Sequence, residues 1–238
     1  MDRIICDDYE SLSNVAADII AAQLNRKHNS VLGLATGSTP LGLYAELVRR
    51  FDAGEIDFSG TSSYNLDEYY PINKDHPQSY NYYMRENLFS KVNFAFSRLF
   101  DGEAADPQAE CAKFDSEIST VGGIDLQLLG VGINGHIGFN EPAESYSMAS
   151  YLVELADSTL AANSRFFTSG EVQPKLALTM GFGAIFNAKS ILLLISGASK
   201  APIAKRLFEG RVYSDTPASL LLLHPDVTVL IDRDALGA

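Results

Sequence analysis

The sequence predicts an α/β fold. Short apolar segments of the kind expected for strands buried on both faces recur along all 238 residues. They alternate with longer segments whose apolar residues have helical spacing, a pattern typical of parallel sheets covered by helices. No internal repeat, low-complexity tract or linker interrupts this alternation. We therefore expect residues 1–238 to form a single domain, three-layer and Rossmann-like, in which a mostly parallel sheet has helices on both faces.

The first half of the chain begins with an expected strand at residues 3–6 and a helix at residues 9–27. A buried strand follows at residues 31–35 and runs into a second helix, which Thr39 is expected to cap with Pro40 at its first position. A third strand, residues 62–66, ends in Asp67 and Glu68. At least one of these two carboxylates is expected in a solvated acidic turn, because alternate side chains diverge. His76 and Pro77 are expected to open the next helix, whose inner stripe, expected in the core, is Tyr80, Met84 and Leu88.

In the second half, Asp106 and Pro107 predict a helix start, and glycines at 122 and 123 its end. Its expected buried face is Cys111, Phe114, Ile118 and Val121. Lys200 is expected in the first turn of a later helix. The remaining expected strands are residues 126–131, 151–155, 191–195 and 227–231.

Composition and charge exclude several classes of protein. The net charge of −12 argues against a nucleic-acid-binding surface, which needs a basic stripe. No apolar run has the roughly 20 residues needed to span a bilayer, and the N-terminus lacks the apolar segment of a signal peptide. The two cysteines suggest neither a disulfide framework nor a cysteine-based zinc site. We expect a cytoplasmic protein.

The Thr-Gly-Ser-Thr-Pro turn at residues 36–40 joins a buried strand to a helix N-terminus. Unpaired backbone N–H groups and the helix dipole make such a turn suitable for a phosphate. It is not a Walker A loop, because the required lysine is missing. An ordinary capped helix explains the same residues, so both interpretations stay open. Lys200 lies at another helix start, where an anionic ligand or simple tolerance at the surface explains it equally.

The apolar run at residues 126–131 ends in glycines and is followed by His136, with Asn134 and Glu141 close by. Glycine allows the backbone to approach a ligand, and histidine can move protons near neutral pH. A tight turn with a structural histidine remains an alternative. Asp67 lies at the carboxyl end of a strand, where open α/β sheets bind their ligands.

Other motifs do not fit. Residues 130–135 match the dinucleotide-binding pattern, but the glycine and proline that follow are incompatible with the helix that the pattern requires. The chain has no Gly-x-Ser-x-Gly nucleophile elbow, and its four histidines lack zinc-site spacing. Residues 156–174 are more polar and are interpreted as a cover over a site. Arg165 lies within that segment and, alone, is most simply a solvated arginine.

Together these segments resemble the glucosamine-6-phosphate deaminase family, in the superfamily of glucosamine isomerases and phosphogluconolactonases. The resemblance runs from end to end, and its strongest part is Gly-His-Ile-Gly-Phe-Asn-Glu-Pro at residues 135–142. The other segments that carry it are residues 34–40, 65–69, 163–167, 197–200 and 223–225.

The resemblance implies aldose–ketose isomerisation with deamination: glucosamine 6-phosphate and water give fructose 6-phosphate and ammonia, without a cofactor or a metal ion. Asp67 would remove the C2 proton to give a cis-enolamine and return a proton at C1. His136 would open the pyranose ring, and Asn134 and Glu141 would orient and polarise its imidazole. The substrate phosphate would be held by Gly37, Ser38, Thr39, Arg165 and Lys200.

The chain departs from parts of the family in two places. Some members carry Asp where Asn134 stands, and because an amide has no charge, Glu141 is the expected electrostatic partner of His136. Allosterically activated members carry basic residues where Tyr151 and Val153 stand. We therefore expect a monomer or small homo-oligomer, not an allosteric hexamer. The expected partner is a small-molecule sugar phosphate, with no nucleic acid and no membrane.

Two alternatives are open at this level. A 6-phosphogluconolactonase-like hydrolase shares the phosphate turn and the Gly-His pair but lacks the Phe-Asn-Glu-Pro continuation at residues 139–142. A non-catalytic sugar-phosphate-sensing domain tends to lose the acid/base set, whereas Asp67, His136 and Glu141 are all present here.

Overall fold

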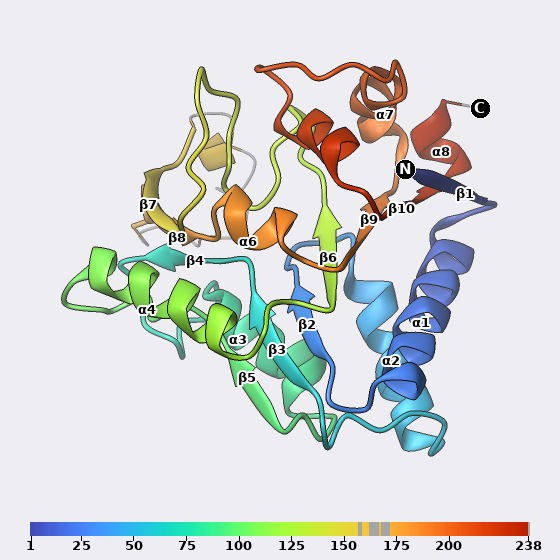
Figure 1. Ribbon diagram of the computed structural model, residues 1–238, viewed down its shortest axis with the longest axis horizontal. Helices are drawn as coiled ribbons and strands as arrows, with labels where there is room; N and C mark the ends of the chain where they lie inside the picture. Colours follow the sequence, from blue (N-terminus) through green and yellow to red (C-terminus); the bar gives the residue numbers. More distant parts are fainter. Residues whose placement is uncertain (157–158, 162–166, 168–171, 238) are drawn as a thin grey trace.

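The computed structural model describes residues 1–156, 159–161, 167 and 172–237 (Figure 1). In these residues seven strands form one sheet in the order β1-β10-β9-β6-β2-β3-β5, and every neighbouring pair is parallel. The predicted fold class is confirmed. The strands of this sheet are β1 (Asp2–Cys6), β2 (Val31–Leu34), β3 (Ser62–Asn65), β5 (Phe96–Arg98), β6 (Leu126–Gly130), β9 (Ser190–Ile195) and β10 (Val227–Asp232).

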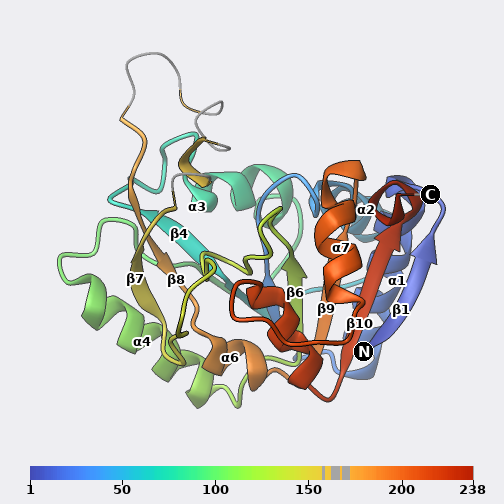
Figure 2. The ribbon, with the colours of Figure 1, turned by 90° about the horizontal axis from the view of Figure 1, so that it is seen from above.

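The helices cover both faces of this sheet. Crossovers between parallel strands are almost always right-handed, so the strand order puts α1, α2 and α3 on one face and α4, α6 and α7 on the other. Figure 2 shows α2 and α3 across the sheet from α4 and α6. A short α8 follows β10. The helices are α1 (Tyr9–Arg26), α2 (Leu41–Asp52), α3 (Tyr80–Met84), α4 (Pro107–Thr120), α6 (Phe182–Phe186), α7 (Ala201–Leu207) and α8 (Arg233–Leu236). None of the helices in the described residues combines the length and apolar character needed to cross a bilayer.

A second, smaller sheet was not predicted. In the described residues it contains β4 (Asp67–Tyr70), β8 (Leu176–Thr179) and β7 (Tyr151–Glu154), paired antiparallel in that order. The expectation that Asp67 or Glu68 lies in a solvated turn is therefore wrong. Both carboxylates are buried in β4, because that strand pairs with β8, a segment more than 100 residues further along the chain.

The start of α2 also differs from the prediction. The helix begins at Leu41, Pro40 occupies the cap position, and no side chain caps it. Thr39 is displaced from this role by Tyr9, whose hydroxyl accepts a 2.7 Å hydrogen bond from the backbone N–H of Gly42. The first turn of α2 thus takes its hydrogen-bond partner from α1, which the local sequence does not reveal.

Smaller shifts affect three other predictions. The third helix begins after Ser79, whose hydroxyl accepts from the Tyr82 N–H at 2.9 Å, and not at His76. Val121 follows the end of α4 and is exposed. Lys200 ends a 3₁₀ turn (Ala198–Lys200) and immediately precedes α7.

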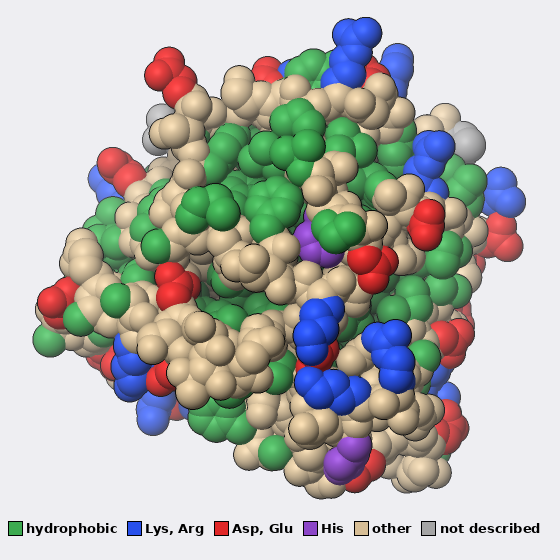
Figure 3. All heavy atoms as spheres, in the orientation of Figure 1, with side chains coloured by type: hydrophobic (Ala, Val, Ile, Leu, Met, Phe, Trp, Pro, Cys, Tyr) green, Lys and Arg blue, Asp and Glu red, His purple; other side chains and the backbone are tan. Residues whose placement is uncertain are grey.

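The amino ends of the central strands are fixed by Asp125, which directly precedes β6. Its carboxylate contacts the ammonium groups of Lys27 at 2.6 Å and Lys189 at 2.7 Å, and it accepts from the Val31 N–H at 2.8 Å. These contacts tie β6 to the neighbouring strands β2 and β9. The opposite, carboxyl ends of the same strands are left to build a site. On the face shown in Figure 3, Lys and Arg side chains stand singly or in small groups among acidic ones.

Candidate active site

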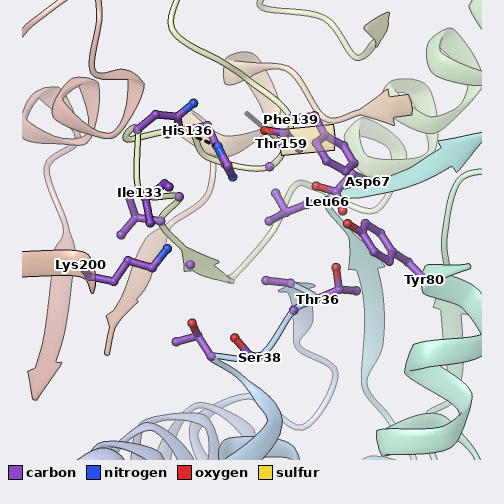
Figure 4. Close-up of a pocket in the computed structure, with 18 of the residues that line it drawn as sticks. Thr36, Ser38, Leu66, Asp67, Tyr80, Ile133, His136, Phe139, Thr159 and Lys200 are labelled. Atoms are coloured by element: carbon purple, nitrogen blue, oxygen red, sulfur yellow. Dashed lines mark hydrogen bonds between the residues drawn. The ribbon is translucent and has the colours of Figure 1, made fainter. Parts of the chain in front are cut away.

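A cavity of about 360 Å³ opens at the carboxyl ends of β2 and β6. These neighbouring strands lie where the chain reverses its direction of travel across the sheet, the position at which open α/β sheets bind ligands. Figure 4 shows Ser38 and Lys200 on one side of the cavity, Asp67 and Tyr80 on the opposite side, and the His136 ring pointing in between them. The walls also include Thr36, Gly37, Thr39, Leu66, Ile133, Asn134, Phe139, Thr159 and Ser199.

The turn after β2 presents its N–H groups and not its carbonyls. The Tyr83 hydroxyl donates to the Gly37 carbonyl at 2.7 Å, and the Tyr9 hydroxyl lies 3.1 and 3.0 Å from the carbonyls of Ser38 and Thr39. The N–H groups of residues 37–39 donate to no acceptor in the part of the chain that the structure describes. Gly37 has φ +97°, which a side chain would disfavour. The arrangement suits an anion.

Lys200 lies on the same side of the cavity as Ser38 of this turn (Figure 4). Its ammonium group pairs with no carboxylate among the described residues, and burial lowers the pKa of Lys200. A cation that is partly removed from water and has no protein counterion favours an anionic ligand. Arg165, the other predicted phosphate-binding cation, lies outside the described residues.

His136 is oriented by an amide relay. The Asn134 side chain donates from Nδ2 to Glu141 Oε2 at 2.6 Å, and its Oδ1 lies 2.7 Å from His136 Nδ1. An amide oxygen only accepts, so Nδ1 carries the ring hydrogen and donates it to Asn134. The Nε2 lone pair is then free to accept a proton. The three residues that sequence reasoning grouped are therefore brought together.

Glu141 supplies the negative charge of this relay. Its Oε2 lies 3.4 Å from His136 Nδ1, and its Oε1 accepts from the Thr159 hydroxyl. Burial raises the pKa of Glu141, but its interaction with His136 and its hydrogen bonds from Thr159 and Asn134 outweigh this rise. The net pKa is lowered, and the carboxylate stays ionised.

Two glycines make room for the side chains of His136 and Asp67. A Cβ at Gly132 would lie 2.2 Å from Cε1 of His136, so any side chain there would clash with the imidazole ring. A Cβ at Gly138 would lie 3.1 Å from the Thr179 hydroxyl and 3.3 Å from Asp67 Oδ2, and Gly138 has φ +57°. The glycine-rich segment is thus a close-approach loop that places His136 and Asp67 around one cavity.

Asp67 is the most perturbed acid in the cavity. Only 6% of the residue is exposed. Burial, followed by the negative charge of Glu68, raises the pKa of Asp67 from 3.8 to about 8. A carboxyl group with a pKa near the working pH can both accept and return a proton, as a general acid–base catalyst must.

Sequence reasoning missed part of the wall. Tyr80 packs against the core as predicted, but its side chain also lines the cavity, which the prediction did not include. Thr159, which holds Glu141, carried no local signal, since it is brought to the site from the polar segment after β7. In the described residues no group of three or more His, Cys, Asp or Glu side chains is arranged to hold a metal ion.

The raised pKa of Asp67 predicts a pH-dependent stability. Between pH 3.8 and about 8, the folded protein holds a proton that the unfolded chain has released. The stability due to the protonated carboxyl is therefore complete below pH 3.8 and is lost as the pH rises to about 8. We expect Asp67→Asn, which cannot ionise, to raise the free energy of unfolding by about 1–2 kcal/mol at pH 9 and by less at pH 5. Urea titrations at both pH values measure this, and an equal gain at both would contradict it.

Comparisons with known proteins identify the family. The family model described as glucosamine-6-phosphate isomerases/6-phosphogluconolactonase matches residues 7–230. A glucosamine-6-phosphate deaminase of Thermoanaerobacter pseudethanolicus is 49% identical over 237 residues, which cover 99% of this chain and 94% of the relative. One from Geobacillus sp. is 50% identical over 239 residues, covering 100% and 95%.

Solved structures give the same result. A structure described as a monomeric glucosamine-6-phosphate deaminase superposes with a TM-score of 0.95 at 44% identity, covering 100% of this chain and 99% of that one. A 6-phosphogluconolactonase from Leishmania guyanensis has a TM-score of 0.76 at 20% identity over 98% and 97% of the chains, a likeness of fold alone. The chain belongs to the glucosamine-6-phosphate isomerase/6-phosphogluconolactonase family.

Proposed function

We propose that this protein is an enzyme that converts glucosamine 6-phosphate and water to fructose 6-phosphate and ammonia. The observation that carries the proposal is the cavity in which Asp67 and the His136 relay face an anion-binding turn. Relatives about half identical over nearly the whole chain are glucosamine-6-phosphate deaminases. We also propose that residues 1–238 act as one domain.

The phosphate is proposed to bind at the turn after β2. Gly37, Ser38 and Thr39 offer backbone N–H groups, and Lys200 offers a cation from the same side of the cavity. Arg165 is proposed to join them when substrate is bound. Local donors are needed here, because a net charge of −12 gives an anionic substrate no help at long range.

Ring opening is proposed to use His136. Its Nε2 takes the proton from the C1 hydroxyl, the C1–O5 bond breaks, and the proton is delivered to O5. The imidazole is positively charged between the two transfers, and the nearby Glu141 carboxylate stabilises that charge. Asn134 keeps the ring in the tautomer with Nδ1 protonated.

Isomerisation is proposed to use Asp67. Its carboxylate removes the C2 proton of the open chain, while the protonated C2 amine gives up one proton and the C1 carbonyl oxygen gains one, so that a cis-enolamine forms. Asp67 then returns a proton to C1, and water adds at C2 to release ammonia. The substrate itself helps to ionise the base, because a protonated amine at C2 favours a neighbouring carboxylate.

The proposal predicts turnover of one substrate. Incubation with glucosamine 6-phosphate should give ammonia and fructose 6-phosphate in equal amounts, measured by coupled assays. Asp67→Asn is the matched variant: it should bind the sugar phosphate but not exchange the C2 proton with deuterated solvent. Turnover of 6-phosphogluconolactone alone would identify a lactonase. Binding of glucosamine 6-phosphate by the wild-type protein without turnover would identify a sensor.

The relay predicts unequal losses of kcat when Glu141 and Asn134 are substituted. Glu141→Gln removes the charge beside His136, and we expect kcat to fall about 100-fold. Asn134→Asp keeps an oxygen toward Nδ1 and adds a carboxylate, so kcat should fall less than about 10-fold. Steady-state kinetics of the two variants provide the comparison. If Asn134→Asp were the slower one, Glu141 would not be the source of the stabilising charge.

We further propose a monomer that has no allosteric effector. The structural relative at 44% identity is described as monomeric. Tyr151, which stands where activated members carry a basic residue, is used internally, because its hydroxyl donates to Asn140 Oδ1 at 3.3 Å. Sedimentation equilibrium should give the mass of one chain, 25.9 kDa. Addition of N-acetylglucosamine 6-phosphate should leave the half-saturating substrate concentration unchanged, and a marked decrease would refute the proposal.

A further inference from the structure

Glu68 is a buried carboxylate that the proposed reaction does not use. Only 1% of it is exposed, and no cation pairs with it in the described residues. Its Oε1 accepts from the N–H groups of Tyr69 at 2.9 Å and Tyr80 at 2.8 Å, and its Oε2 accepts from the N–H of Asn81 at 2.8 Å. The Glu68 carboxylate therefore binds the backbone N–H groups of the first two residues of α3.

Tyr80 is the residue held most directly. Its backbone N–H donates to Glu68, while its side chain lines the cavity. The ring stacks on Phe139, with centroids 6.0 Å apart and planes 11° apart, and lies 5.0 Å from the ring of Tyr69. In Figure 4 the Tyr80 hydroxyl points toward the Asp67 carboxylate. A small movement at the start of α3 would therefore move the group that faces Asp67.

Glu68 completes the cap of α3 with a buried charge. Ser79 accepts from the Tyr82 N–H at 2.9 Å, which leaves the N–H groups of Tyr80 and Asn81 to Glu68. Burial raises the pKa of Glu68 to about 7 even though the backbone N–H groups of Tyr80, Asn81 and Tyr69 oppose this rise. A buried acid beside a second buried acid costs stability, and such costs concentrate at functional sites.

We propose that Glu68 is a positioning residue, which fixes Tyr80 so that the Tyr80 hydroxyl orients the Asp67 carboxylate toward C2 of the substrate. Successive side chains of a strand point to opposite faces, so Asp67 faces the cavity while Glu68 reaches back to α3. Glu68 acts through the backbone of Tyr80 and does not touch the substrate. The inference rests on the proposed function, because it assumes that Asp67 is the base.

A double-mutant cycle tests the coupling. The variants are Glu68→Gln, which keeps the size but loses the charge and one acceptor, Tyr80→Phe, which loses only the hydroxyl, and their combination. The titratable groups around Asp67 are Glu68 and Tyr69 from β4 and Tyr80 from α3, so kcat is measured on the alkaline side, where Asp67 is ionised in every variant. Each single variant should lose about 10- to 100-fold in kcat and in C2 proton exchange, with KM changed less than about threefold.

The combined variant decides between coupling and independent effects. If Glu68 works through Tyr80, the double variant should be no slower than the slower single variant. Losses that multiply, or a single variant with wild-type kcat, would overturn the inference. Absence of wild-type turnover would instead refute the proposed function, which separates the two failures.

A matched control covers loss of folding. Ser79→Ala removes the other cap of α3 without changing any charge near Asp67. Thermal melts should show both Ser79→Ala and Glu68→Gln folded, with only Glu68→Gln strongly reduced in kcat. If Glu68→Gln does not fold, Glu68→Asp replaces it in the cycle, because it keeps the charge but shortens the reach to Tyr80 and Asn81. Equal kcat losses in Ser79→Ala and the Glu68 variant would reduce Glu68 to a helix cap and overturn the inference.

Discussion

The site depends on how the backbone passes through Leu66. Its N–H donates to the Leu34 carbonyl at 3.1 Å in the parallel sheet, and its carbonyl accepts from the Met180 N–H at 2.7 Å, just beyond β8 of the antiparallel sheet. The chain therefore changes sheets within one residue, with both peptide groups satisfied. Asp67 follows at once, and its backbone is fixed at the carboxyl edge of the large sheet. A flexible loop in this position could not hold a base to the accuracy that proton transfer requires.

Asp67 and Glu141 are two carboxylates whose different environments give them different pKa values. Asp67 is buried within β4 of the small sheet and lies beside Glu68, so its pKa rises to about 8. Glu141 is also partly buried, but its interaction with His136 and its hydrogen bonds from Thr159 and Asn134 lower its pKa. One acid can therefore exchange a proton near neutral pH while the other stays ionised. Environments that separate the pKa values of acids in one cavity assign their roles.

The sequence predicted the strands and helices that local residue patterns determine. Two strands, at residues 191–195 and 227–231, and the helix capped by Asp106 are confirmed. The sequence shows them because apolar runs and capping residues act over short distances. The predictions that failed depend on distant partners. The strand nature of Asp67 and Glu68 needs β8, and the displaced cap of α2 needs Tyr9. The cavity beside Tyr80 was not predicted, because helical spacing shows which face is covered, not whether a cavity lies beside it.

Asn134 shows why a neutral residue suits this relay. Its amide has distinct ends, with the oxygen toward His136 and the nitrogen toward Glu141, so the hydrogen-bond directions are fixed. A carboxylate at residue 134 would set two acidic oxygens at hydrogen-bonding distance, and the pair would favour sharing a proton. The negative charge beside the imidazole would then belong to neither residue alone. With an amide in this position, Glu141 keeps the whole charge, and the fixed hydrogen-bond directions hold His136 in the tautomer with Nδ1 protonated.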